Sequence, residues 1–173
     1  MLFEVPNSAN SVWPIETGWS PLIPELRTSV WLAPTLAAWI LGWGALAGLL
    51  KRRGGWRTGD TRKLFHFAIF SAATELGATL GMPAVNLLGG LTLLYVLAAV
   101  WRGAGDLLYE ALAREGDAPR RALHVVVPLI ATAAGGILSA ALFGPAAIVG
   151  MAVGGWGDAV GEPVGIRFGR RRF

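Results

Sequence analysis

Residues 29–50 read SVWLAPTLAAWILGWGALAGLL, and this stretch contains no charged side chain. A helix of about 20 apolar residues is long enough to span the hydrocarbon core of a bilayer, so the stretch predicts a membrane-spanning helix. The whole chain agrees: of its 173 residues, 54% are hydrophobic and only 15% are charged, against about 25% in a typical soluble domain. The composition therefore favours an integral membrane protein.

Further apolar stretches follow the first and predict four more spans. They cover 64–80, 84–101, 124–143 and a short, glycine-rich stretch from about Ala146 to Gly157. Because the last is short for a full crossing, we expect it to end inside a protein-lined cavity, where broken backbone is tolerated. Asp60 or Thr61 is the expected N-cap of the second span, and Gly81 and Gly144 mark turns. The sequence thus predicts an all-α, polytopic bundle of about five spans.

The remaining segments are shorter and less regular. Residues 1–28 contain four prolines and no continuous apolar run, so we expect an irregular interfacial segment without a signal peptide. Residues 29–173 form a single transmembrane domain. Within it, the polar stretch 102–121 predicts a short amphipathic helix on the surface.

The basic residues predict the orientation of the bundle. With five spans, every Lys and Arg except Arg27 falls on one side of the membrane, in the first loop, the third loop or the C-terminal segment. The positive-inside rule then places the N-terminus outside and the C-terminus in the cytoplasm, as in a multi-pass protein of the cell inner membrane. The same distribution explains the pI of about 10.3 without nucleic acid as a partner. Cysteine is absent, which excludes disulfides and thiol catalysis.

The first motif with chemical potential is Arg62-Lys63-Leu64-Phe65-His66, at the start of the second span. Arg62 and His66 are four residues apart, so they share one face of a helix. Two cations and an imidazole at the membrane surface suit phosphate binding, and His66 can shuttle a proton. The alternative is that Arg62 and Lys63 are topology signals and His66 is an interfacial histidine.

The second motif runs from Gly157-Asp158-Ala159 through Gly161, Gly165 and Gly169 to the C-terminal arginines. A carboxylate directly after an apolar span can hold a divalent cation with nucleotide phosphates. Glycines let a backbone come close to a ligand, and arginines neutralise phosphate. The alternative is a helix-packing face of small residues followed by a stop-transfer cluster. No P-loop sequence is present.

Three further groups of polar residues favour structural roles. Glu75 lies near the middle of the second span, and a hydrogen bond to a neighbouring span, for example to Asn86, explains it more simply than catalysis. Asp106 and Glu110 are one turn apart, which suits either a metal or, more simply, a solvated helix face. His124 is expected at the interface, and no zinc-ligand spacing is found.

Taken together, the two motifs resemble the polyprenol kinase family, which includes dolichol kinase, phytol kinase and CTP-dependent diacylglycerol kinases. The segment from Arg102-Gly103-x-Gly105-Asp106 to Tyr109-Glu110 also looks like the polar loop of the phytol kinase type. The resemblance covers roughly residues 50 to 173. It implies transfer of the γ-phosphate of CTP, with Mg²⁺, to the hydroxyl of an isoprenoid or other lipid alcohol in the bilayer.

The resemblance also implies roles for individual residues. Asp158 would be the carboxylate for metal and nucleotide, and His66 would act with it in catalysis. The residues implied in nucleotide binding, with the glycines lining a loop, are Arg62, Lys63, Gly161, Gly165, Arg167, Gly169, Arg170, Arg171 and Arg172.

Two departures from the family pattern leave other functions open. Family members continue past this point, which suggests that the chain is incomplete at its C-terminus, and the pair Glu162-Pro163 is unusual. A lipid-phosphate cytidylyltransferase would use the same nucleotide and metal but release a CDP-lipid. A membrane scaffold or small transporter is the non-enzymatic alternative. Glycine-rich spans are also compatible with a homo-oligomer.

Overall fold

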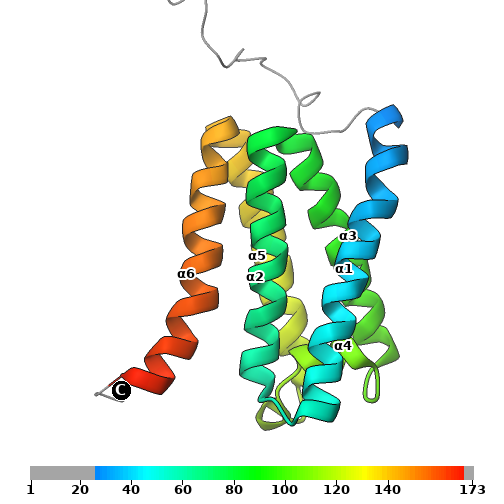
Figure 1. The fold of residues 1–173 in the computed structure, drawn as a ribbon, viewed down its shortest axis with the longest axis vertical. Coiled ribbons are helices and arrows are strands. Elements are labelled where there is room, and N and C mark those ends of the chain that lie inside the picture. Colours follow the sequence, from blue (N-terminus) through cyan, green and yellow to red (C-terminus); the bar gives the residue numbers. More distant parts are fainter. Residues whose placement is uncertain (1–25, 170–173) are drawn as a thin grey trace, which may run out of the picture.

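The structure, a computed structural model, describes residues 26–169, and every regular element in that part of the chain is helical (Figure 1). The fold is an all-α bundle, as the sequence predicts. The elements are α1 (Leu26–Gly54), α2 (Thr58–Thr79), α3 (Met82–Arg102), α4 (Leu107–Leu112), η3 (Glu115–Asp117), α5 (Arg121–Phe143), η4 (Gly144–Ala146) and α6 (Ala147–Phe168).

The turns lie where the sequence places them. Gly81, between α2 and α3, has a φ of 81°, and Gly144, between α5 and α6, has a φ of 53°. Only glycine adopts such angles without strain, so these residues end their helices. The expected N-cap of the second span is wrong, because α2 already begins at Thr58 and Arg57 is its N-cap.

The largest difference from the sequence analysis is the length of α6. The predicted span ends near Gly157, but α6 continues as a helix to Phe168 and contains Pro163. The predicted glycine loop is therefore wrong in this structure: Gly161 and Gly165 lie within a helix. A membrane helix can accommodate proline and glycine because its surroundings satisfy the freed backbone groups. The consequence is that Asp158 and Glu162 lie one helical turn apart on one continuous helix.

The core lies where α1, α3 and α4 meet. Fully buried side chains there include Ile40 of α1, Leu88 of α3 and Leu108 of α4. Two glycines of α1 allow the close approach. A Cβ at Gly48 would lie 2.6 Å from Leu107, and one at Gly44 would lie 2.8 Å from the Tyr95 ring. Real Cβ atoms do not approach so closely, so neither site accepts a larger residue without movement.

Helix α4 is not the surface helix that the sequence predicts. Four of its six residues are buried, namely Leu108, Tyr109, Ala111 and Leu112. The helix packs mainly against α1, with further contacts to α2 and α3. The stretch is amphipathic, as expected, but its apolar face completes the protein core and does not lie on the membrane. It thereby fixes the loop that follows, which carries Arg114.

Helix α6 packs chiefly against α2. Two glycines allow this contact: Gly155 of α6 meets the Phe70 side chain, and Gly77 of α2 meets Ile148. Close contacts at small residues are typical of helix pairs in membranes. In Figure 1, α6 descends beside α2 and then diverges from the bundle toward its C-terminal end.

The outer surfaces of α5 and α6 are apolar. Ala140 is the only buried residue of α5, while Ile130, Ile137 and Leu142 are all more than half exposed. Three helical stretches of the described chain are long and apolar enough to cross a membrane, namely Ser29–Gly54, Met82–Arg102 and Arg121–Phe168, and the last contains both α5 and α6. Apolar surface of this extent suits a lipid environment. The chain is therefore a membrane protein.

Helix α2 is long enough to cross a bilayer but is not among those three stretches. It carries Asp60, Arg62, Lys63 and Glu75, so its crossing stays a prediction. The charged ends of the elements nevertheless gather at one end of the bundle. The α1–α2 loop, α4, η3 and the C-terminal end of α6 all lie at the lower end in Figure 1, opposite the Gly81 and Gly144 turns.

Candidate functional site

Lys63 of α2 is a buried cation held by two carboxylates. Its side chain is 4% exposed, and its Nζ lies 2.5 Å from Asp158 Oδ1 and 2.9 Å from Glu162 Oε2. A buried ammonium group is tolerated when it is paired and hydrogen-bonded. Asp158 and Glu162 are i and i+4 on α6, so both reach the same point. The three residues connect α2 to α6 at the charged end of the bundle.

Glu162 also binds a third segment of the chain. Its Oε1 accepts a hydrogen bond from Arg114 Nη2 at 2.7 Å. Arg114 precedes η3, in the loop that α4 holds in place. A continuous chain of ion pairs therefore runs from Asp158 through Lys63 and Glu162 to Arg114. It ties α6 to both α2 and this loop.

His66 lies one turn after Lys63 and faces the other oxygen of the same carboxylate. Its Nδ1 is 3.4 Å from Asp158 Oδ2, and the edge of its ring meets Phe70 with 6.1 Å between the ring centroids. Asp158 is thus shared, with Oδ1 on Lys63 and Oδ2 on His66. When Nδ1 donates to Asp158, Nε2 carries the lone pair and is available to accept a proton.

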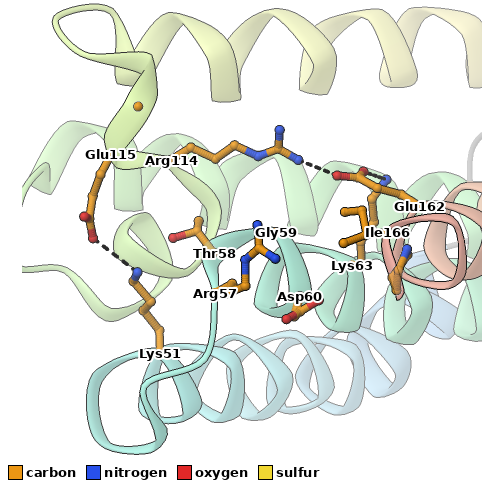
Figure 2. Close-up of a pocket in the computed structure, with 12 residues that line it drawn as sticks. Lys51, Arg57, Thr58, Gly59, Asp60, Lys63, Arg114, Glu115, Glu162 and Ile166 are labelled. Carbon is orange, nitrogen blue, oxygen red and sulfur yellow. Dashed lines mark hydrogen bonds and ion pairs between the residues drawn. The ribbon is translucent and has the colours of Figure 1, made fainter. Parts of the chain in front are cut away.

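A charged pocket of about 480 Å³ opens beside this cluster. Figure 2 shows it between the α1–α2 loop, the start of α2, the Arg114 loop and α6. Its lining includes four cations, Lys51, Arg57, Lys63 and Arg114, and three acids, Asp60, Glu115 and Glu162. Thr58 and Gly59, the first residues of α2, also line it, so the positive end of the helix dipole lies at the pocket.

The cations of this pocket differ in their pairing. Lys51 Nζ lies 3.2 Å from Glu115 Oε1, and both side chains are partly in contact with solvent. Arg57 forms no ion pair with any described residue. It is therefore free to bind an anion that enters the pocket. Pro163 and Ile166 of α6 provide an apolar part of the wall.

A second hollow, of about 280 Å³, lies at the Asp158 end of the ion-pair chain. Its polar members are His66, Asp158 and Thr132, and the rest of its lining comes from Phe70, Met151 and three glycines of α6, Gly150, Gly154 and Gly155. It therefore lies among α2, α5 and α6.

Asp106 and Glu110 form a separate cluster with a structural role. Asp106 caps α4, because its Oδ1 accepts hydrogen bonds from the N–H groups of Leu108 and Tyr109, and its Oδ2 accepts one from Arg102 Nε at 2.6 Å. Glu110 accepts a hydrogen bond from Arg121 Nη2 at 2.8 Å. Neither forms the solvated face that the sequence analysis favours. Within residues 26–169, no group of three or more His, Cys, Asp or Glu side chains is placed to hold a metal.

Burial alone would raise the pKa of Asp106, but the hydrogen bonds from Tyr109 N–H and Arg102 outweigh it and hold the pKa below the ordinary value. Burial acts in the same direction on Glu110. There the hydrogen bonds from Arg121 and from Gly105 N–H lower the pKa. Both side chains are therefore ionised at neutral pH.

The structure brings together three of the predicted site residues, Lys63, His66 and Asp158, although 92 or more residues separate Asp158 from the other two. Arg62 is half-buried and makes no ion pair with the described residues. Gly161 and Gly165 are exposed on α6, where a Cβ would meet nothing within 4 Å. Arg167 is exposed near the end of α6.

The remaining predicted site residues lie at or beyond the C-terminal end of α6. Gly169 ends that helix, while Arg170, Arg171 and Arg172 lie outside the described residues.

Sequence reasoning missed several residues of the charged pocket. The sequence marks Glu162 only as part of an unusual pair, although its i+4 spacing from Asp158 is a usable signal. Lys51, Arg57 and Arg114 look like topology charges in the sequence, and only the fold brings them together. Glu75 is exposed on α2, so it is not a buried acid, and its pairing with Asn86 stays a prediction. His124 is exposed at the start of α5.

Comparisons with known proteins add no relative. No family model matches the chain, and no curated protein and no solved structure matches it either.

Proposed function

We propose that this protein is a membrane-embedded phosphotransferase that moves the γ-phosphoryl group of a nucleotide to the hydroxyl of a lipid alcohol. The observation that carries the proposal is the shared carboxylate Asp158. Asp158 lies between Lys63, which lines the charged pocket, and His66, which lines the apolar hollow. Phosphoryl transfer needs positioned cations, a carboxylate for metal and a nucleophile in line.

The charged pocket is the proposed site of the nucleotide phosphates. Arg57, Lys63 and Arg114 provide charge, and the N-terminal end of α2 adds a partial positive charge. This assignment replaces the glycine segment as the phosphate site, because Gly161 and Gly165 face away from other residues. CTP as the donor and an isoprenoid alcohol as the acceptor follow from the resemblance to polyprenol kinases.

Asp158 and Glu162 fit Mg²⁺ as a cofactor. Magnesium commonly takes one or two carboxylates and completes its octahedron with water and substrate phosphates. Two carboxylates one turn apart on α6, both within 3 Å of the Lys63 ammonium group, already converge on a positive charge. The bound ion would supply neutralisation of the charge on the phosphates. Lys63 lines the charged pocket, where it would bind those phosphates when the ion takes its place on the carboxylates.

The charged end of the bundle also suggests where the reaction takes place, at the cytoplasmic surface of the membrane. With five crossings and the basic end in the cytoplasm, the charged pocket meets soluble nucleotide. The hollow beside it lies among helices that face lipid. A lipid alcohol places its hydroxyl at the headgroup level, so the two substrates can meet at Asp158.

A product assay tests this function. The full-length protein, reconstituted in bilayers, would receive γ-labelled CTP or ATP with phytol, farnesol, geranylgeraniol, dolichol or diacylglycerol. The expected product is a labelled lipid monophosphate from at least one alcohol. A CDP-lipid formed from a lipid phosphate would instead establish the cytidylyltransferase. Absence of both products from folded protein would contradict the proposal and leave a scaffold or transporter.

A further inference from the structure

The hollow of about 280 Å³ has a polar end and an apolar body. His66 and Asp158 form the polar end, while Phe70, Met151 and the glycines of α6 form most of the rest. Its walls come from α2, α5 and α6, and the last two helices belong to the apolar stretch Arg121–Phe168. A ligand there has its polar group at the charged end of the bundle and its apolar part among membrane helices.

The wall between the hollow and the charged pocket is thin. Lys63 and Glu162 line the pocket, and His66 and Asp158 line the hollow. The Lys63–Asp158 ion pair, at 2.5 Å, joins the two. A phosphoryl group bound at Lys63 and a hydroxyl bound at His66 would therefore both lie beside Asp158, which suits a donor site and an acceptor site of one reaction.

We propose that the hollow is the acceptor site and that it takes a long-chain alcohol, with the hydroxyl on His66 and the hydrocarbon chain between α5 and α6. This inference rests on the proposed function and adds where the lipid binds and which residues admit it. Gly150 and Gly154 are exposed, and a Cβ at either would meet no other atom within 4 Å. Because no side chain projects from these residues, this wall of the hollow stays open.

His66 positions the alcohol for the transfer step. Its Nδ1 lies 3.4 Å from Asp158 Oδ2, and its Nε2 is the ring nitrogen left to hydrogen-bond the hydroxyl. The alcohol oxygen forms a bond to the γ-phosphorus as the bond from that phosphorus to the β,γ-bridging oxygen breaks. The lipid phosphate and the nucleoside diphosphate are the products. The proton of the alcohol hydroxyl is released to water.

Filling the hollow tests the inference. Gly154 lines the hollow and a Cβ there would meet no other atom within 4 Å, so Gly154→Leu adds bulk at this wall. Gly135→Leu, on the exposed surface of α5, adds the same side chain outside both cavities. The probe is a long-chain isoprenoid alcohol with a diazirine in its chain, irradiated with the reconstituted full-length protein. Peptides that carry the label are identified by mass spectrometry. Competitors are the unmodified alcohol and the matching hydrocarbon without a hydroxyl.

We expect label on the peptides around Thr132 and Met151, and competition by the alcohol but not by the hydrocarbon. The amount of label on these peptides should fall about tenfold in Gly154→Leu but not in Gly135→Leu. Label elsewhere, equal labelling of Gly154→Leu, or equal competition by the hydrocarbon would overturn the inference, the last because bulk lipid chains then fill the hollow.

Turnover is scored separately with wild-type protein. Specific labelling of the hollow without phosphoryl transfer would contradict the proposed function but keep the alcohol site. Transfer together with label elsewhere would contradict the acceptor site alone. In an active protein, Gly154→Leu should raise the KM for the alcohol by about tenfold and leave the KM for the nucleotide unchanged.

Discussion

At the scale of single residues, Lys63 is the least replaceable charge of the bundle. Its removal takes from Asp158 its lysine partner and leaves Glu162 with Arg114 alone. Breaking a buried pair costs about 3–5 kcal/mol. Because Asp158 is 54% exposed, water compensates in part, and we expect Lys63→Met to lower the free energy of unfolding by about 1–3 kcal/mol. Denaturant unfolding in detergent measures this change.

Lys51→Met is the matched control for this prediction. It removes the same side chain from an ion pair whose partner, Glu115, is 76% exposed, so the expected cost is at most about 1 kcal/mol. Equal costs for the two variants would show that burial does not distinguish the two lysines.

Asp106 gives the protein a defined sensitivity to acid. Its pKa is lowered in the folded state, so its contribution to stability is present above the unfolded pKa of about 3.9 and is lost as the pH falls through the lower folded value. Asp106→Asn should cost about 1 kcal/mol at pH 7, as loss of a helix cap and an ion pair does. The stability difference from wild type should shrink between about pH 4 and pH 2.

Unfolding midpoints measured at pH 7, 5, 4 and 3 check this prediction. A difference that stays constant across the series would contradict the lowered pKa. Asp117 of η3 forms no ion pair among the described residues. We therefore expect Asp117→Asn to leave the dependence of stability on pH unchanged.

At the scale of elements, the close approach of α6 to α2 depends on Gly155. A Cβ there would collide with Phe70, and overpacking of this kind costs about 1–3 kcal/mol. Gly155→Ala should therefore loosen α6, and thermal unfolding together with amide exchange in α6 would measure the loss. Gly161→Ala meets no atom within 4 Å and should be neutral or slightly stabilising, because alanine favours helix.

A second substitution shows whether this collision is the cause. Phe70→Ala removes Cγ and Cδ1, two of the three atoms that a Cβ at Gly155 would meet. The double variant Gly155→Ala with Phe70→Ala should therefore be less destabilised than the sum of the two single variants. Strict additivity would contradict the proposed contact.

The sequence predicts the helices of this protein better than their ends. Apolar runs and the glycine-proline turns locate α1, α3 and α5 closely, because length and hydropathy decide spans in a membrane. The same reasoning ends α6 too early. In soluble proteins, glycines and a proline such as Pro163 usually mark the end of a helix. Here the contacts of Gly155 with Phe70 and of Asp158 with Lys63 stabilise α6 beyond its predicted end. Such tertiary contacts are not visible in local patterns.

The candidate site was predictable only in part, for the same reason. His66, Lys63 and Asp158 stand out because ionisable residues near spans are costly and are therefore informative. Arg114 and Arg57 look like ordinary loop charges until α4 packs into the core and brings the loop back over α2. The division into a charged pocket and an apolar hollow depends on three helices and cannot be read from one motif.

At the scale of the whole molecule, the bundle has a charged end and an apolar body, and the predicted orientation puts the charged end in the cytoplasm. The chain has no cysteine, so single cysteines report sides cleanly. Gly116→Cys lies beside the charged pocket, and Leu80→Cys lies at the opposite turn. In intact cells, a membrane-impermeant maleimide should label Leu80→Cys and label Gly116→Cys only after lysis. The reverse pattern would contradict the orientation.

We propose that Asp158 serves the transfer of the γ-phosphoryl group from a nucleotide to a lipid alcohol. The rate of transfer of labelled γ-phosphate in bilayers tests this role in wild type, Asp158→Asn and Asp117→Asn. The amide keeps the size of the side chain, and Lys63 retains Glu162, so the variant should fold. We expect kcat to fall by about 10²–10³-fold in Asp158→Asn and to stay unchanged in Asp117→Asn. Undiminished transfer by Asp158→Asn would contradict this role.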